Sequence, residues 1–287
     1  MLSVLLAAAL NGPVVDNWSL AQRNAGVLRI STLFDARRVG EYLSDDAGIE
    51  RAIDFCRRHG ITHVYLESYR DKVVADKEVL ARARDRFRAA GFLVSGCVTP
   101  TQLGRKSTGW QGIACFTAEE SQRDLKAVFE YAASLFDEIM IDDFLFTDCW
   151  CPDCVAAKGN RSWAEYRCDL MLRVCQTHAL DAARAVNPKA RLIIKYPCWH
   201  EDFQERGYDV IRQSRAFGGT WVGTETRGGM PGSRWPEEPQ YRAYWLMRWL
   251  LGIGGEKCGG GWHDTFGTDV VHYLQQSRQT ILGGARE

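Results

Sequence analysis

The chain has 287 residues, of which 46% are hydrophobic and 25% charged. This is ordinary globular usage, and it excludes disordered and fibrous proteins. Its 36 basic and 36 acidic residues leave a formal net charge of zero, whereas a protein that binds nucleic acid through the phosphates is normally basic, so we expect no nucleic-acid partner.

The first predicted element is an N-terminal extension over residues 1–26. Its apolar stretch LSVLLAAAL at 2–10 has the size of a signal-peptide core, but no basic residue precedes it. The extension is either the remnant of a secretion signal or an ordinary helix. The first reading predicts a secreted or periplasmic protein, and the second a cytoplasmic one. No apolar run reaches the roughly 18 residues that a membrane-spanning helix needs, so we expect no membrane span.

From residue 27 onward, a strand followed by a helix is repeated along the chain. Apolar runs predict strands at 27–34, 61–67, 92–98, 137–143, 191–196, 219–225 and 256–262. Apolar residues at helical spacing predict helices at 47–60, 76–91, from 117 onward, at 162–186, 202–215, 241–251 and 268–282. Two of these helices open with the capping-box pattern, at Thr117–Glu120 and Ser162–Glu165, in which a hydroxyl and a carboxylate satisfy free backbone amides.

Strands that alternate with helices predict a parallel sheet. Seven such units without a break in composition favour one catalytic domain over 27–287, a (β/α)8 TIM barrel that lacks its eighth strand. The alternative is a doubly wound open sheet, but no glycine-rich dinucleotide motif follows the first strand. Because a closed barrel needs eight strands, we expect a chain truncated at its C-terminus. A gap about one strand wide should then separate the first strand from the seventh.

Ionisable residues gather where the predicted strands end, which is the catalytic face of a (β/α)8 barrel. They are Asp35, Glu67, Asp142, Asp143, Lys195, Glu225, His263 and Asp264. Two carboxylates facing each other across the barrel mouth are the minimum for glycoside hydrolysis, so the pattern predicts a carbohydrate substrate. Adjacent residues of a strand point to opposite faces, so only one of Asp142 and Asp143 is expected to line the pocket.

Four tryptophans in or beside the predicted loops are candidates for contact with a sugar ring, namely Trp110, Trp199, Trp235 and Trp262. The expected substrate-binding set is Asp35, Glu67, Trp110, Lys195, Trp199, Arg227, Trp262, His263 and Asp264. Each one alone is more commonly core filler or a solvated charge, so the hypothesis depends on the set. Binding sites are mostly apolar with a few polar groups, which suits this mixture.

A cluster of cysteines follows the fourth predicted strand. Cys149, Cys151 and Cys154 place three thiols within six residues, and a tetrahedral zinc site needs one more ligand. Cys115, in the preceding loop, is the best candidate, with Cys97 and Cys198 as alternatives. Such a site has no open position, so its zinc would be structural. The competing interpretation is free thiols or one disulfide.

The loop CWCPDC resembles the cysteine loop of family 42 β-galactosidases, which are (β/α)8 barrels with a structural zinc. That resemblance implies zinc ligands at Cys115, Cys149, Cys151 and Cys154. The Asn-Glu pair that this family carries after strand four is replaced here by Asp142-Asp143.

An aspartate after strand four and an acid after strand six are instead similar to α-galactosidase-like barrels. This likeness implies Asp142 or Asp143 as nucleophile, Glu225 as general acid/base, and retention of configuration. The whole chain, with its segments IDDF, IIKYP and GTETR, resembles bacterial glycoside-hydrolase-like barrels.

Two other functions are compatible with these residues. A metal-dependent hydrolase would hold a catalytic ion between His263, Asp264, Asp142 and Glu67, but the first strand lacks the paired histidines typical of such barrels. A non-catalytic barrel that only binds sugar is the third possibility.

Overall fold

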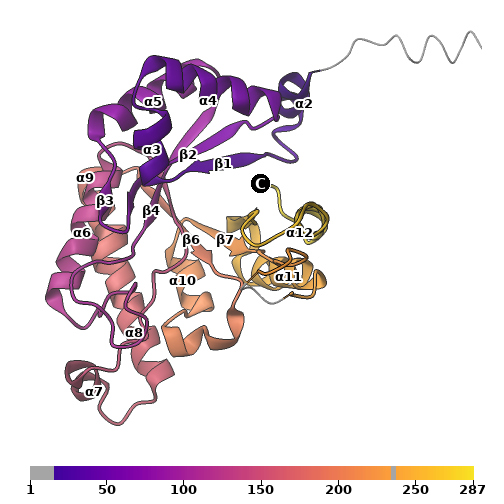
Figure 1. Ribbon diagram of the computed structural model, residues 1–287. Coiled ribbons are helices and arrows are strands. Elements are labelled where there is room, and N and C mark those ends of the chain that lie inside the picture. The colour runs from indigo at the N-terminus through magenta and orange to yellow at the C-terminus, as the bar shows by residue number, and fades with distance from the viewer. Residues whose placement is uncertain (1–15, 234–236) are drawn as a thin grey trace, which may run out of the picture.

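The computed structural model describes residues 16–233 and 237–287 as a curled parallel sheet with helices on its outside (Figure 1). Within these residues the parallel strands are β1 (Ser31–Phe34), β2 (His63–Arg70), β4 (Leu93–Thr99), β5 (Glu138–Ile141), β6 (Arg191–Tyr196), β7 (Gly219–Gly223) and β8 (Cys258–Trp262). Each pairs with the next, and the short β3 (Val73–Val74) pairs antiparallel with β2. The prediction of a barrel with seven strand–helix units is confirmed.

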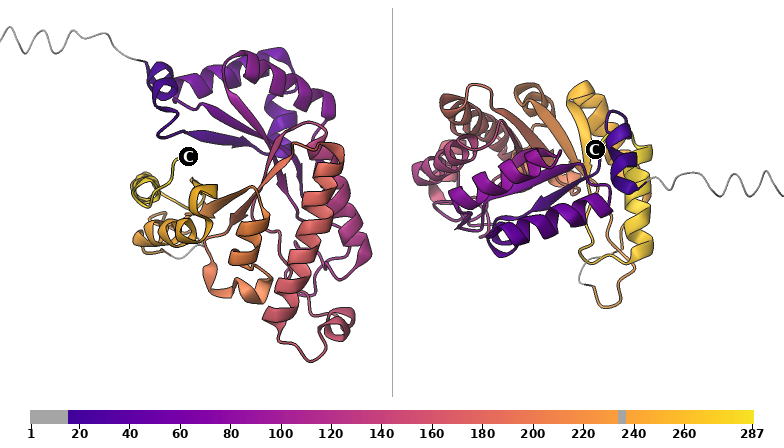
Figure 2. Two further views of the ribbon diagram at one scale, coloured as in Figure 1. Left: turned by 180° about the vertical axis from the view of Figure 1, so that it is seen from behind. Right: turned by 90° about the horizontal axis from the view of Figure 1, so that it is seen from above.

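Most of the helices cover the outer face of the sheet (Figure 2). The helices of the described residues are α2 (Asn17–Asn24), α3 (Ala36–Tyr42), α4 (Asp46–Arg58), α5 (Lys77–Ala89), α6 (Glu119–Ala133), α7 (Pro152–Lys158), α8 (Trp163–Val174), α9 (Asp181–Val186), α10 (Val210–Ala216), α11 (Tyr241–Gly254) and α12 (Val270–Leu282). Of these, α7 lies away from the strands (Figure 1). A π-helical turn, Cys175–Leu180, joins α8 to α9. In the described part of the chain, no helix is long and apolar enough to cross a membrane.

The barrel is open between β1 and β8. No ladder of the described strands joins these two, but the C-terminal residues lie between them (Figures 1 and 2). The Arg29 N–H donates to the Arg286 carbonyl at 2.8 Å, and the Gly261 N–H donates to the Glu287 carbonyl at 2.8 Å. These bonds bridge one end of the opening.

The expected N-terminal extension is only partly described. Its apolar segment 2–10 lies outside the described residues, whereas residues 17–24 form α2. Trp18 of that helix packs on Phe92 with ring centres 4.6 Å apart, and the Asn17 amide donates to the Arg58 carbonyl at 2.8 Å. This part of the extension therefore packs against the barrel.

The strands alternate their side chains between two hydrophobic clusters. Outward residues such as Val64, Leu66 and Ile194 join the main core beneath the helices. Inward residues form a second cluster inside the barrel, made of Tyr65, Cys97, Met140, Ile193 and Trp221 with Leu33 and Trp262 against it. This apolar layer fills the barrel interior below the polar side chains at the carboxyl ends of the strands.

One of the two expected capping boxes is confirmed and the other is wrong. Ser162 and Glu165 bond reciprocally at the start of α8. In contrast, α6 begins at Glu119, and its N-cap Ala118 makes no side-chain bond. The Thr117 hydroxyl instead lies 2.9 Å from the Cys154 sulfur, because the chain there turns toward the cysteine loop.

Gly260 provides a first test of the packing inside the barrel. It lies opposite Trp221 in the ladder of β7 and β8, and a Cβ at this glycine would lie 2.0 Å from the indole ring. We expect Gly260→Ala to lower the free energy of unfolding by about 1–3 kcal/mol, the usual cost of overpacking. Gly252→Ala, on the exposed face of α11 with nothing within 4 Å, should raise it by about 0.5–1 kcal/mol. Urea unfolding of both variants measures the difference, and equal shifts would contradict the packing described here.

Candidate active site

The carboxyl ends of the strands converge on one buried ammonium group, that of Lys195 near the end of β6. Its Nζ lies 3.0 Å from Asp142 Oδ1, 3.2 Å from Asp143 Oδ1 and 2.9 Å from Glu225 Oε1. The two aspartates directly follow β5, and Glu225 follows β7. Burial disfavours the charged lysine, but the three carboxylates hold its pKa well above the ordinary value. Lys195 therefore holds three acids in fixed positions.

A second cation, Arg70 at the end of β2, completes the network. Its Nε lies 2.8 Å from Glu67 Oε2, and one terminal nitrogen lies 2.6 Å from Asp142 Oδ2. The ladder between β2 and β4 shifts register between Glu67 and Tyr69, and this bulge allows Arg70 to face the same side as Glu67. The Thr99 hydroxyl donates to Glu67 Oε1 at 2.5 Å. Burial raises the pKa of Glu67, although Arg70 opposes that shift.

The adjacent aspartates Asp142 and Asp143 have opposite electrostatic environments. Burial tends to raise the pKa of Asp142, but Lys195 and Arg70 each bind one of its oxygens and hold that pKa below its usual range. At Asp143, burial and the nearby charges of Glu225 and Asp142 outweigh Lys195 and raise the pKa to about 7. Asp143 can therefore carry a proton near neutral pH, whereas Asp142 stays ionised.

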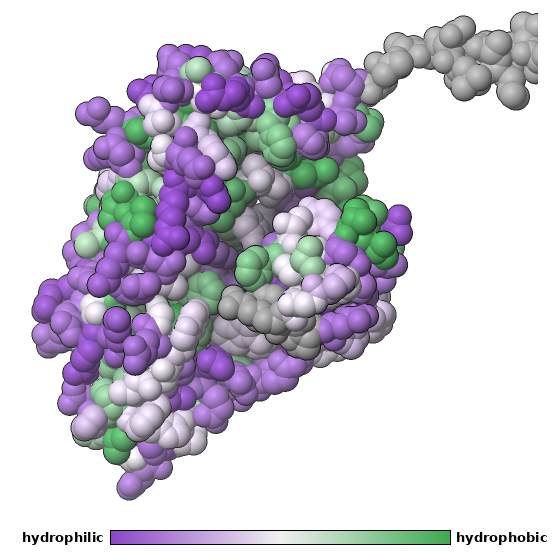
Figure 3. Space-filling view, in the orientation of Figure 1, coloured by the Kyte–Doolittle hydropathy of each residue, from purple (hydrophilic) through white to green (hydrophobic). Residues whose placement is uncertain are grey.

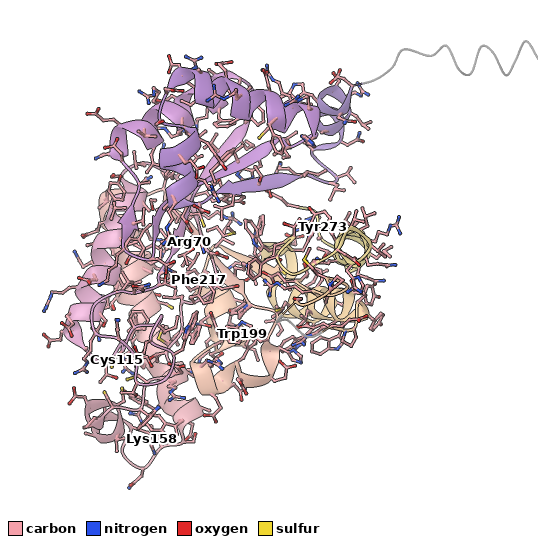
Figure 4. The ribbon with its side chains drawn as sticks, in the orientation of Figure 1. Arg70, Cys115, Lys158, Trp199, Phe217 and Tyr273 are labelled. Carbon is pink, nitrogen blue, oxygen red and sulfur yellow. The ribbon has the colours of Figure 1, made fainter. Side chains whose placement is uncertain are left out.

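A cleft of about 650 Å³ opens above this network, a usual size for a ligand site. Figure 4 labels Arg70 and Trp199, two residues that line it, and Figure 3 shows a separate hollow between the β1–α5 and α11–α12 parts, on the side where the barrel is open. The lining residues are Arg70, Trp110, Asp143, Phe144, Phe146, Asp148, Cys198, Trp199, Arg206, Glu225, Arg227 and Phe266. Glu225 Oε2 is buried and has no hydrogen-bond partner among the described residues, whereas Asp143 Oδ1 faces Lys195.

One wall of the cleft is aromatic. Trp110 meets Phe144 edge-on with ring centres 5.2 Å apart and lies parallel to Phe146 at 6.2 Å. Trp199 meets Phe146 edge-on with ring centres 5.2 Å apart. Phe144 has a φ of 76°, which is rare for a bulky residue and allows the chain to turn sharply after Asp143. Such rings suit the apolar faces of a sugar.

The structure brings some of the predicted site residues into the cleft and places others elsewhere. Trp110, Trp199 and Arg227 line the cleft beside Asp143 and Glu225. Lys195 and Asp142 lie directly beneath it. Asp35 caps α3 by accepting the N–H groups of Arg37 and Arg38. Glu67 is buried under Arg70, and Trp262 packs inside the barrel with its ring 5.2 Å from Lys195 Nζ.

The expected catalytic-metal group is not assembled. His263 lies 2.7 Å from the Ser277 hydroxyl in a separate cavity between β1 and β8, where burial lowers its pKa. Asp264 pairs with Arg227 at 2.8 Å, and Asp142 and Glu67 are both bound to Arg70. Among the residues that the structure describes, the one group of possible ligands close enough to share a metal is made of cysteines.

Several residues of the cleft were missed by sequence reasoning. They are Arg70, Phe144, Phe146, Asp148, Cys198, Arg206 and Phe266. Arg70 was missed because the second strand was expected to end at Glu67, three residues too early. The segment FLF directly after Asp143 was a usable signal for Phe144 and Phe146, because it places aromatic rings at the end of a barrel strand. No local pattern marks Arg206.

The four cysteines predicted as metal ligands come together beside the aromatic wall. The sulfur atoms of Cys115, Cys149, Cys151 and Cys154 all lie within 4.8 Å of one another. A hydrogen bond from Cys154, together with Arg105, lowers the pKa of Cys115 to about 4, although burial opposes the shift. The alternatives Cys97 and Cys198 lie in the barrel interior and in the cleft. The cluster is compatible with a bound metal.

A parallel barrel with paired acids and an aromatic cleft at the carboxyl ends of its strands is an arrangement that glycoside hydrolases use. Residues 17–287 match the family described as "probable glycosyl hydrolase, catalytic domain", and the chain belongs to this family. An uncharacterised protein of Saccharolobus solfataricus is 27% identical over 266 residues, which are 82% of this chain and 43% of that protein. The chain thus spans less than half the length of this relative.

Solved structures of other proteins are also similar to this chain. An exo-β-1,4-mannosidase from Opitutaceae bacterium strain TAV5 superposes with a TM-score of 0.52 at 14% identity, over 90% of this chain and 50% of that one. A fungal β-1,4-galactanase structure superposes with a TM-score of 0.48 at 11% identity, over 95% of this chain and 85% of the galactanase chain. At 14% identity, the likeness to the mannosidase establishes the fold of this chain and says nothing about its substrate.

Proposed function

We propose that this barrel hydrolyses glycosidic bonds, with Asp143 as general acid/base and Glu225 as nucleophile. One observation carries the proposal. Asp143 and Glu225 both face the cleft and both contact Lys195, and Glu225 Oε2 is buried without a hydrogen-bond partner among the described residues. An unpartnered buried oxygen is costly, and a reacting substrate would use it.

The geometry supports a retaining mechanism. The two carboxylate oxygens that contact Lys195 Nζ at 3.2 Å and 2.9 Å can be at most about 6 Å apart. Retaining enzymes hold their carboxyl groups about 5–5.5 Å apart, and inverting enzymes about 6.5–9.5 Å apart. The contact of both carboxylates with one ammonium group thus favours the shorter separation, which is that of retaining enzymes.

In the first step, protonated Asp143 gives its proton to the glycosidic oxygen while Glu225 Oε2 attacks the anomeric carbon. The bond to the leaving oxygen breaks, and an ester forms between the sugar and Glu225. In the second step, ionised Asp143 takes a proton from water, the water oxygen attacks the same carbon, and Glu225 leaves as a carboxylate beside Lys195.

These roles are the reverse of those implied by the likeness to α-galactosidase-like barrels. We assign the acid role to Asp143 because its pKa is raised to about 7, and a general acid must hold its proton near the working pH. Asp142 is bound by two cations and does not line the cleft. It acts as a positioning residue together with Glu67.

We further propose that the cysteine cluster holds one structural zinc ion. Four ligands at 2.3 Å from a tetrahedral zinc would lie about 3.8 Å from one another. The sulfur of Cys115 lies 3.8 Å from that of Cys151 and 3.5 Å from that of Cys154, and the last two are 3.6 Å apart. Four thiolates leave no position for water, so this zinc would take no part in the reaction.

The acid and nucleophile roles can be tested with a panel of chromogenic α- and β-glycosides. We expect Asp143→Asn and Glu225→Gln each to lower kcat by at least about 100-fold. Activity should fall as the pH rises through about 7, because Asp143 then loses the proton it must donate.

Asp54→Asn, on the exposed face of α4, is the matched control and should behave like wild type. If Glu225→Gln leaves the turnover of every hydrolysed glycoside unchanged, the assignment is wrong. Sugar binding without any turnover would favour a binding barrel instead.

A further inference from the structure

Arg206 stands out among the cations of the cleft because its guanidinium is held by rings and only weakly by acids. Its guanidinium carbon lies 4.9 Å from the ring centre of Trp199 and 5.4 Å from that of Phe146. Its carboxylate contacts are long, at 3.7 Å to Asp148 and 3.5 Å to Asp202. A charge-assisted hydrogen bond of this kind normally spans about 2.7–2.9 Å.

The other two arginines of the cleft are fully engaged. Arg70 has carboxylate oxygens at 2.8 Å and 2.6 Å, and Arg227 has one at 2.8 Å. The acid of the cleft that faces Arg206 is also engaged elsewhere, because Asp148 accepts the Ser107 hydroxyl at 2.5 Å and the Trp110 N–H at 2.9 Å. Arg206 Nε is buried without a hydrogen-bond partner among the described residues. Arg206 thus keeps unused capacity to bind an anion.

We propose that Trp110, Phe146, Trp199 and Arg206 form a subsite for a sugar residue that carries an anionic group. The sugar ring would lie against the aromatic wall, and its carboxylate or sulfate would bind the terminal nitrogens of Arg206. A guanidinium is planar and presents paired donors that match such an anion, and stacking on Trp199 fixes its plane in advance. This subsite rests on the proposed function, since it lies in the cleft of Asp143 and Glu225.

The position of the subsite fits a neighbouring sugar better than the one that reacts. Phe146 comes three residues after Asp143, and Arg206 belongs to the 3-10 turn Gln204–Arg206 in the loop after β6. The Thr147 N–H donates to the Arg206 carbonyl at 3.1 Å and joins the two loops. Binding energy from such a remote group can contribute to catalysis when it holds the reacting bond in place.

The test measures binding by calorimetry, so that it does not depend on turnover. The probes are glucuronate, galacturonate and glucose 6-sulfate, with glucose and galactose as neutral counterparts, and the protein is the full chain carrying Glu225→Gln. We expect the preferred anionic sugar to bind at least about tenfold more tightly than its neutral counterpart at low salt. Glucuronate or galacturonate as the best probe would identify a carboxylate substrate, and glucose 6-sulfate a sulfated one.

Variants of Arg206 locate the binding. Arg206→Gln should remove the preference for the anionic sugar, and Arg206→Lys, which keeps the charge but loses the planar fork, should retain part of it. Arg184→Gln removes one exposed charge on α9 and should change nothing. The same thermal midpoint for these variants shows that they are folded.

Equal affinity for charged and neutral sugars, or a preference that survives Arg206→Gln, overturns the subsite. Hydrolysis of neutral glycosides that Asp143→Asn abolishes would leave the proposed function intact in that case. Conversely, an Arg206-dependent preference without any turnover would support the subsite and contradict the proposed reaction.

Discussion

Replacing Asp142 by asparagine should destabilise the protein strongly, whereas the same change at Asp143 should stabilise it at neutral and alkaline pH. Asp142 binds Lys195 and Arg70 in a buried site, and removing one partner of a buried ion network typically costs about 3–5 kcal/mol. Its low pKa means that this contribution is present at neutral pH and is lost in acid.

Ionised Asp143 has the opposite effect on stability and destabilises the folded protein, because its pKa is raised to about 7 there. An unfolded aspartate titrates near 3.9, so between about pH 4 and pH 7 the folded chain binds the extra proton and stability declines as the pH rises. Above pH 7 the folded protein carries the full free-energy cost of burying the ionised Asp143 carboxylate. Asp143→Asn removes it, and we expect a gain on the order of 4 kcal/mol at pH 8 that disappears below about pH 4.

Urea unfolding of both variants at pH 8 and at pH 4 measures these effects. The pair is its own control, because each variant makes the same chemical change one residue apart. If both variants were destabilised alike at pH 8, the burial and charge environment that we describe for Asp143 would be wrong. The gain in stability should accompany the loss of activity expected for this residue.

The sequence did not distinguish these two aspartates, because the difference comes from partners that are far away along the chain. Asp142 and Asp143 follow the same apolar run, and the expectation that one of them lines the pocket did not say which. Arg70 binds Asp142 and so leaves Asp143 to line the cleft. Arg70 reaches Asp142 because of a bulge in β2, which cannot be recognised from the residue types in that strand. Periodicity predicts where a strand runs more reliably than how its end is shaped.

The fold itself could be predicted because its signals are local. The strand β6 was expected at 191–196 and lies at Arg191–Tyr196, since an apolar run between two helices fixes both of its ends. The capping box at Thr117 failed for a non-local reason, because the hydroxyl contacts Cys154 from another loop. The stacking of Arg206 on Trp199 and Phe146 is also non-local, so it could be found only in three dimensions.

The cysteine cluster joins the two loops that carry the aromatic wall of the cleft. Cys115 belongs to the loop after β4, and Cys149 to the loop after β5. The same loops are linked by the Trp110 N–H, which donates to Asp148 at 2.9 Å, and by the Trp150 N–H, which donates to the Thr108 hydroxyl at 2.9 Å. A metal at the cluster would thus hold Trp110 against Phe144 and Phe146.

Loss of this metal should therefore weaken both the fold and the binding of substrate. Binding of a structural zinc is worth about 10–16 kcal/mol in small zinc domains, and that energy stabilises the folded state. For Cys115→Ser we expect the zinc content to fall from about one per chain to near zero. The free energy of unfolding should fall by roughly 5 kcal/mol, and the melting temperature by about 10 °C or more. KM should rise about tenfold and kcat should change less, because the loops bind the sugar and the acids lie on the strand ends.

Metal analysis, thermal unfolding and steady-state kinetics on the purified full chain check the three effects. Cys168→Ser is the matched control, because Cys168 is buried outside the cluster and its sulfur donates to the Gln204 carbonyl, a bond that a serine hydroxyl can keep. A Cys115→Ser protein that keeps one zinc and melts like the control would show that the four sulfurs do not share an ion. A loss of zinc with unchanged KM would separate the metal from the aromatic wall, since in that case the hydrogen bonds from Trp110 and Trp150 would suffice to hold the two loops.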